Sequence, residues 1–109
     1  IWNLVYGQLP FGVNVKIIIK DMFKDDDTTR IAGEKLRKMI EKTTEKIILD
    51  FSNIKIASAS FFDEGIAKLG EENWDSNKVN ALLVFENLFK RDKELLISVC
   101  ENRNIKIEL

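Results

Sequence analysis

The sequence predicts an α/β domain in which a mixed sheet of four to five strands carries about three helices, mainly on one face. Two observations lead to this fold class. Short apolar segments with strand patterning alternate along the chain with longer segments in which apolar residues recur at helical spacing. The chain is also 45% hydrophobic and 32% charged, which is typical of a globular protein. The predicted element order is β-β-α-β-α-β-α-β, with residues 1–109 forming a single domain.

The first two elements are predicted to be strands that pair antiparallel. Residues 13–20 alternate between apolar and polar side chains, and residues 1–6 do so more weakly. Glycine and proline between them supply the turn chemistry. Residues 1–11 are interpreted as a loosely attached N-terminal strand, and whether they belong to the native fold stays open.

The middle of the chain is predicted to form a helix, a strand and a second helix. The first helix covers about residues 28–42, after an acidic loop that suits the positive end of a helix dipole. Residues 46–51 are mostly apolar at successive positions, which is typical of a central strand. The second helix runs to about residue 71 from Ser60–Asp63, which matches the Ser-x-x-Asp form of a capping box.

The last part of the chain is predicted to form a strand over residues 79–85, a helix over residues 90–102 and an edge strand over residues 105–109. Two glycines fall inside predicted helices, where each costs about 1 kcal/mol relative to alanine. A close contact between helix and sheet would explain both Gly33 and Gly65.

Composition excludes several function classes. The chain contains no histidine, so it has no Ser-His triad, Cys-His dyad, histidine-ligated zinc or imidazole base. Its single cysteine permits no internal disulfide, which favours a reducing, cytoplasmic location. A net charge of -1 argues against a nucleic-acid partner, and no apolar run approaches the length of a membrane span. The oligomeric state does not follow from the sequence.

The region around residues 45–69 resembles a known fold family. Leu49-Asp50-Phe51 ends the buried strand and precedes a serine-rich turn and a helix start, Ser58-Ala59-Ser60-Phe61-Phe62-Asp63-Glu64. Together with Thr29-Arg30 at the start of the first helix, this resembles the STAS-like family of unknown function, which is similar to the STAS domain of bacterial anti-sigma-factor antagonists. The element order matches over about residues 12–109 and the motif-level likeness over about residues 27–69.

The resemblance implies a regulatory module that binds another protein, and not an enzyme. In anti-sigma-factor antagonists the corresponding turn carries Asp-Ser-Ser-Gly, and a partner ATPase with serine-kinase activity phosphorylates one of the serines. In this chain the Asp falls on Ser58, the first Ser on Ala59, the phosphorylated Ser on Ser60 and the Gly on Phe61. Ser60 is therefore retained, whereas the Asp and the Gly are not.

Two hypotheses apply to Ser60. As a helix cap, its hydroxyl would contribute on the order of 1 kcal/mol. As a phosphosite, it would place a phosphate among free backbone N–H groups, where it would repel an acidic partner. Phe61, if exposed, would be a rigid aromatic anchor for that partner. The predicted partner-binding residues are Ser58, Phe61, Asp63, Glu64, Thr29 and Arg30.

Other interpretations carry less weight. The alternative function is a small-ligand or nucleotide-binding domain that uses the same helix N-terminus as an anion site. A magnesium site formed by Asp50 together with Asp21 or residues 25–27 is a further hypothesis, but no catalytic, cofactor-binding or metal-binding residue is assigned. Cys100 and Trp74 are expected to pack in or against the core, and residues 90–93 to form a solvated helix face.

Overall fold

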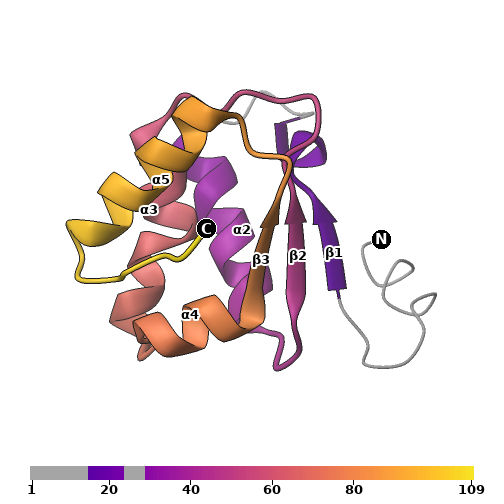
Figure 1. Ribbon diagram of the computed structural model, residues 1–109. Helices are drawn as coiled ribbons and strands as arrows, with labels where there is room; N and C mark the ends of the chain where they lie inside the picture. The colour runs from indigo at the N-terminus through magenta and orange to yellow at the C-terminus, as the bar shows by residue number, and fades with distance from the viewer. Residues whose placement is uncertain (1–14, 24–28) are drawn as a thin grey trace.

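The computed structural model describes residues 15–23 and 29–109. This part of the chain forms a three-stranded sheet and several helices (Figure 1). The strands are β1 (Val15–Ile18), β2 (Ile47–Asp50) and β3 (Leu83–Glu86); the α-helices are α2 (Thr29–Glu41), α3 (Ala59–Gly65), α4 (Ser76–Leu82) and α5 (Lys90–Glu101); and the 3₁₀ helices are η1 (Ile19–Phe23) and η2 (Ala67–Glu72). None of the helices in these ranges is long and apolar enough to cross a membrane.

The sheet is parallel and β2 lies at its centre. The prediction of a central strand over residues 46–51 is therefore confirmed, with Ile47 and Leu49 fully buried. Figure 1 shows the helices gathered on one side of the sheet. This arrangement suits parallel strands, because each crossover must carry the chain back over a sheet face before the next strand begins.

Within the described residues the sheet has fewer strands than predicted, because residues 105–109 do not form a strand, and the strand predicted over residues 79–85 is confirmed only in its second half. Most of residues 79–85 belong to α4, and β3 begins only at Leu83. A helix forms where a strand was predicted, and Asp75 is its N-cap. The Asp75 carboxylate accepts a hydrogen bond from the Lys78 N–H at 2.8 Å. The expected antiparallel partner of β1, at residues 1–6, lies outside the described residues.

The C-terminal segment, residues 105–109, is extended but does not join the sheet. Its backbone bonds instead to side chains of α4. The Lys106 N–H donates to the Ser76 hydroxyl, and the Glu108 N–H donates to the Asn80 side-chain oxygen. The alternating pattern that predicted an edge strand is explained by burial, since Ile105 and Ile107 point into the core.

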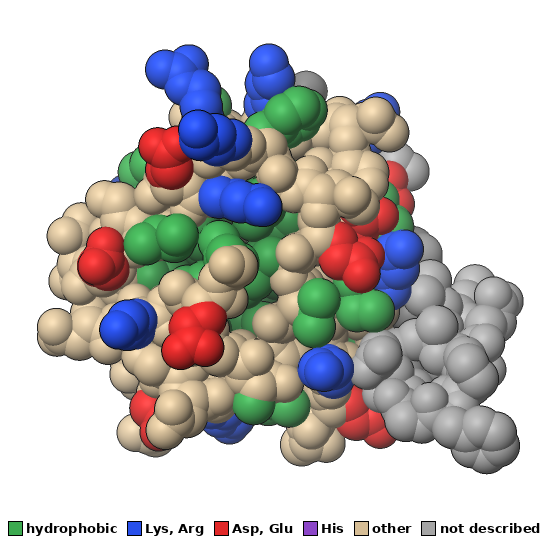
Figure 2. Space-filling view, in the orientation of Figure 1, with side chains coloured by type: hydrophobic (Ala, Val, Ile, Leu, Met, Phe, Trp, Pro, Cys, Tyr) green, Lys and Arg blue, Asp and Glu red, His purple; other side chains and the backbone are tan. Residues whose placement is uncertain are grey.

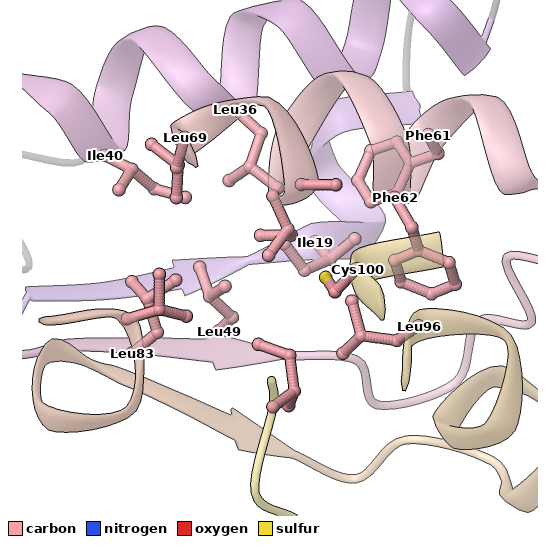
Figure 3. Close-up of a cluster of buried hydrophobic side chains, with 14 of the residues drawn as sticks. Ile19, Leu36, Ile40, Leu49, Phe61, Phe62, Leu69, Leu83, Leu96 and Cys100 are labelled. Atoms are coloured by element: carbon pink, nitrogen blue, oxygen red, sulfur yellow. The ribbon is translucent and has the colours of Figure 1, made fainter. Parts of the chain in front are cut away.

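The core lies between the sheet and the helices, and Figure 3 shows side chains from β2 and β3 facing side chains from α2, α3 and α5. Phe51 and Phe62 are fully buried, with ring centroids 6.1 Å apart. Trp74 and Cys100 are also buried, as predicted. Burial raises the pKa of the Cys100 thiol to about 12, so this group stays protonated at neutral pH.

Helices α2 and α3 approach each other through a pair of glycines. A Cβ atom at Gly33 would lie 2.8 Å from the backbone oxygen of Phe61, and one at Gly65 would lie 3.3 Å from the backbone oxygen of Gly33. The glycines therefore serve a contact between two helices, and the prediction of a contact between helix and sheet was wrong. The sequence could not distinguish the two, because both require a missing side chain.

We expect Gly33→Ala to lower the free energy of unfolding by about 2 kcal/mol, because the added methyl group meets a backbone carbonyl that cannot rotate away. Chemical denaturation measures this change. Gly70→Ala is the matched control, because the one tight contact of its Cβ would be with the flexible end of the Ile105 side chain at 3.2 Å, and the nearest backbone atom, the Arg103 oxygen, lies at an ordinary 3.8 Å. If Gly33→Ala proved stabilising, as helix propensity by itself would predict, the two helices would not be in tight contact.

Candidate functional site

The start of α3 is held by a serine cap and by a buried aspartate from α5. Ser58 is the N-cap residue, and its hydroxyl accepts a hydrogen bond from the Phe61 N–H at 3.3 Å. Before it, Ala57 has a φ of 47°, a left-handed conformation that costs a non-glycine residue energy. Asp92 holds this turn, because its carboxylate accepts the Ile56 N–H at 2.7 Å and the Ala57 N–H at 2.9 Å.

Two expectations for this turn were wrong. The cap is Ser58, whereas Ser60 lies in the first turn of α3 and is half-buried. Phe61 cannot anchor a partner, because its ring is fully buried and lies 5.1 Å from that of Phe23, centroid to centroid. Both errors come from local ambiguity: two serines stood at cap-compatible positions, and nothing in the sequence indicated that both of the adjacent phenylalanines would be buried.

Three of the predicted site residues line one cleft. Arg30 from α2 and Ser60 and Asp63 from α3 border a cleft of about 460 Å³, together with residues from the end of α5 and the turn after it. Thr29 precedes Arg30 in α2 and is exposed. The complete lining is Arg30, Ala59, Ser60, Asp63, Val99, Asn102 and Arg103.

Arg103 is the residue of this cleft that the sequence did not reveal. Its guanidinium donates two hydrogen bonds to the Asp63 carboxylate, and the distance from Nη2 to Oδ2 is 3.0 Å. It also forms an ion pair with Glu71. These hydrogen bonds from Arg103 are the main reason that the pKa of Asp63 is lowered. Arg103 follows a predicted helix and has no spacing relation to Asp63, so no sequence signal could have found the pair.

Glu64 lies behind the cleft, where it joins α2 to α3. Its side chain is buried, and its carboxylate is 2.8 Å from the Lys68 ammonium, 3.1 Å from Arg30 and 3.3 Å from Arg37. The hydrogen bond from Lys68 is the largest cause of the lowered pKa of Glu64. The carboxylate is thus committed to internal partners, which corrects the expectation that Glu64 contacts another protein.

Asp50, at the carboxyl end of β2, is also fully engaged by protein groups. Its Oδ1 accepts hydrogen bonds from the Ser52 N–H and hydroxyl at 3.0 and 2.6 Å and from the Asn87 amide at 3.0 Å. These contacts, with that of the Ser52 hydroxyl the strongest, lower the pKa of Asp50. Across the described ranges, no group of three or more acidic or cysteine side chains is placed to hold a metal ion. The acidic residues 25–27 lie outside those ranges.

We expect Glu64→Gln to lower the free energy of unfolding by about 1–3 kcal/mol at neutral pH, because a neutral amide cannot balance Arg37 and Lys68. Since the pKa of Glu64 is lower in the folded state, its contribution is complete above the unfolded-state value of about 4.3. The contribution is lost as the pH falls through the folded-state pKa, so the difference between wild type and variant should shrink in acid. Denaturant titrations at several pH values measure it.

The control for this prediction is Glu34→Gln, which removes an exposed ion pair with Lys38 on the same helix. Exposed ion pairs between helical residues four positions apart contribute about 0.3–0.5 kcal/mol to the free energy of unfolding. If Glu34→Gln lowered the free energy of unfolding as much as Glu64→Gln, the burial of the Glu64 carboxylate would have no special effect on stability.

Comparison with known proteins places the fold in a family. Searches of curated proteins and of solved structures found no match to the chain. The family described as a STAS-like domain of unknown function matches residues 32–93, which is more than half of the chain and includes the turn before α3 together with all of α3. The resemblance inferred from the sequence is thereby confirmed, and the chain belongs to the family of STAS-like domains of unknown function.

Proposed function

We propose that this STAS-like domain is a non-catalytic regulatory module that binds another protein through the cleft between α2, α3 and α5. We call this region the cleft surface and define it as Thr29, Arg30, Ser60, Asp63 and Arg103. The observation that carries the proposal is that residues from separate helices, singled out by the family resemblance, border one cleft. The family assignment is compatible with such a role.

Ser60 is the proposed switch. Its side chain is half-buried at the cleft and forms no hydrogen bond to any residue in the described ranges, so its hydroxyl is available for modification. A phosphate there would bring a charge of about -1.5 to -2 beside the Asp63 carboxylate. Arg30 could turn toward that phosphate, because its side chain is 67% exposed and Glu64 would keep its other cationic partners. Phosphorylation would therefore change both the charge and the shape of the cleft surface.

The first candidate for the partner is a serine-kinase-like ATPase, as the resemblance to anti-sigma-factor antagonists implies. Such a protein would both bind the cleft surface and phosphorylate Ser60. The charge state of the cleft favours this function over the alternative of a small anionic ligand or nucleotide. Arg103 is already neutralised by Asp63 and Glu71, so a small anion would have to displace two carboxylates from it and would find only Arg30 able to turn toward it.

We expect Ser60→Glu to weaken binding of a serine-kinase-like ATPase, sought among the proteins encoded near this gene, by about tenfold or more, because the added charge opposes an interface built for the hydroxyl. Ser60→Ala should bind like wild type and should not be phosphorylated when the ATPase and ATP are supplied. Calorimetry measures the affinity, and mass spectrometry locates the phosphate.

The matched control is Asn77→Glu, which adds the same charge at the second position of α4, where the side chain is exposed and outside the cleft. It should leave the affinity unchanged. Wild-type affinity in both Ser60→Glu and Arg30→Ala would remove the cleft surface from the interface. Saturable NMR shifts at Ser60 on titration with ATP, without any partner, would instead favour the nucleotide-binding alternative.

A further inference from the structure

A second surface lies at the carboxyl ends of β2 and β3, beside the start of α5. A hollow of about 310 Å³ is lined there by Lys55, Ala57, Phe89, Lys90, Arg91 and Asp92. Figure 2 shows Lys and Arg side chains gathered over this part of the molecule, at the top of the view. We call Lys55, Phe89, Lys90, Arg91 and Lys93 the basic edge. This edge of an open parallel sheet is where α/β folds commonly bind their ligands.

The charges of the basic edge are unfavourable for the helix that carries them. Lys90, Arg91 and Lys93 occupy the first turn of α5, at the positive end of its dipole, where each cation typically costs about 0.3–1 kcal/mol. None of them forms an ion pair within the described part of the chain. The expectation that residues 90–93 form a solvated face holds for Lys90, Arg91 and Lys93, which are exposed, but not for Asp92, which is buried and accepts hydrogen bonds from the loop before α3. Cations that cost local stability without local compensation are typical of a binding surface.

The basic edge also offers an aromatic contact. Phe89 is 43% exposed, although it is large and apolar. The Lys55 ammonium lies 5.2 Å from the centroid of its ring. An aromatic group beside unpaired cations can bind a chain that carries both carboxylates and an apolar side chain. Because Lys55 already covers one face of the ring, Phe89 is poorly suited to stacking between nucleic-acid bases, and the net charge of -1 also disfavours such a partner.

We propose that the basic edge docks an acidic segment of a protein partner, with an apolar side chain of that segment seated beside Phe89. The inference rests on the proposed function for the existence of a protein partner, and it adds the chemistry by which that partner is recognised. The hydrogen bonds from Ile56 and Ala57 to Asp92 join the basic edge to the turn that leads into the cleft surface. An acidic partner also explains how a phosphate on Ser60 would release it, since like charges repel across an interface.

The probe is a short fluorescein-labelled peptide of glutamates and aspartates around a central leucine and phenylalanine, titrated against the full chain. We expect saturable binding that weakens with added salt. The double variant Lys90→Glu, Arg91→Glu should bind the peptide about tenfold or more weakly. It should unfold at a higher temperature than wild type, because the new carboxylates suit the helix dipole, so lost binding would not reflect lost folding.

The matched control reverses two exposed lysines elsewhere, Lys46→Glu with Lys106→Glu, at the other end of β2 and in the C-terminal segment. It changes the net charge equally and should keep the affinity. An equal loss in this control would mean that only overall charge attracts the peptide, and would overturn the proposal. Unchanged binding in Phe89→Ala, or tighter binding of a thymidine oligonucleotide than of the peptide, would overturn it as well.

These results separate the two proposals. Peptide binding that depends on Lys90 and Arg91 supports the basic edge even if Ser60→Glu and Arg30→Ala leave ATPase binding unchanged, which would refute only the cleft surface. Conversely, a cleft-dependent ATPase complex that Lys90→Glu, Arg91→Glu does not weaken would refute only the basic edge.

Discussion

The packing of α2 against α3 depends on one buried carboxylate, that of Glu64. The glycine pair Gly33 and Gly65 lets the two helices approach until there is no room for a side chain between their backbones at these positions. A carboxylate in such a place is tolerated only when cations surround it, and three of them do so here. The close approach and the ion cluster therefore require each other. Without the glycines Glu64 would be solvated, and without its cations the helices would separate.

This contact also determines the geometry of the cleft surface. Arg30 and Asp63 lie on different helices, and their positions on either side of Ser60 follow from how closely α2 and α3 pack. Arg103 then ties Asp63 to the turn after α5, which closes the third side. The cleft is bordered by groups whose charges are already balanced, so under the proposed function recognition would depend on shape and on the Ser60 hydroxyl, which has no hydrogen-bond partner among the described residues. A change of charge at that hydroxyl has a large effect because its surroundings are close to neutral.

Elements set by local patterning were predictable from the sequence, whereas those set by tertiary contacts were not. Amphipathic spacing placed α2 and α5 within one residue of their ends, and the apolar run 46–51 identified the central strand. The first half of residues 79–85 was mispredicted because an apolar run fits both a strand and a helix, and Asp75 before it was not recognised as a helix cap. For the site, the turn and the start of α3 were found, but the burial of Glu64 and Asp92 was not. Acidic residues are normally solvated, and most of the groups that hold these two carboxylates, Arg30 and Arg37 for Glu64 and the Ile56 and Ala57 N–H groups for Asp92, are distant in the sequence.

Asp92 links the two proposed binding surfaces, the basic edge and the cleft surface. Its carboxylate holds the backbone of a loop whose Ala57 has a left-handed conformation, and that loop leads directly into α3. The hydrogen bonds of Asp92 thus connect the basic edge to the loop that leads into the cleft surface. A binder that reached both places at once would gain avidity, because its first attachment would hold its second at a high effective concentration. Specificity could then arise from the spacing between two modest contacts, with neither of them strong by itself.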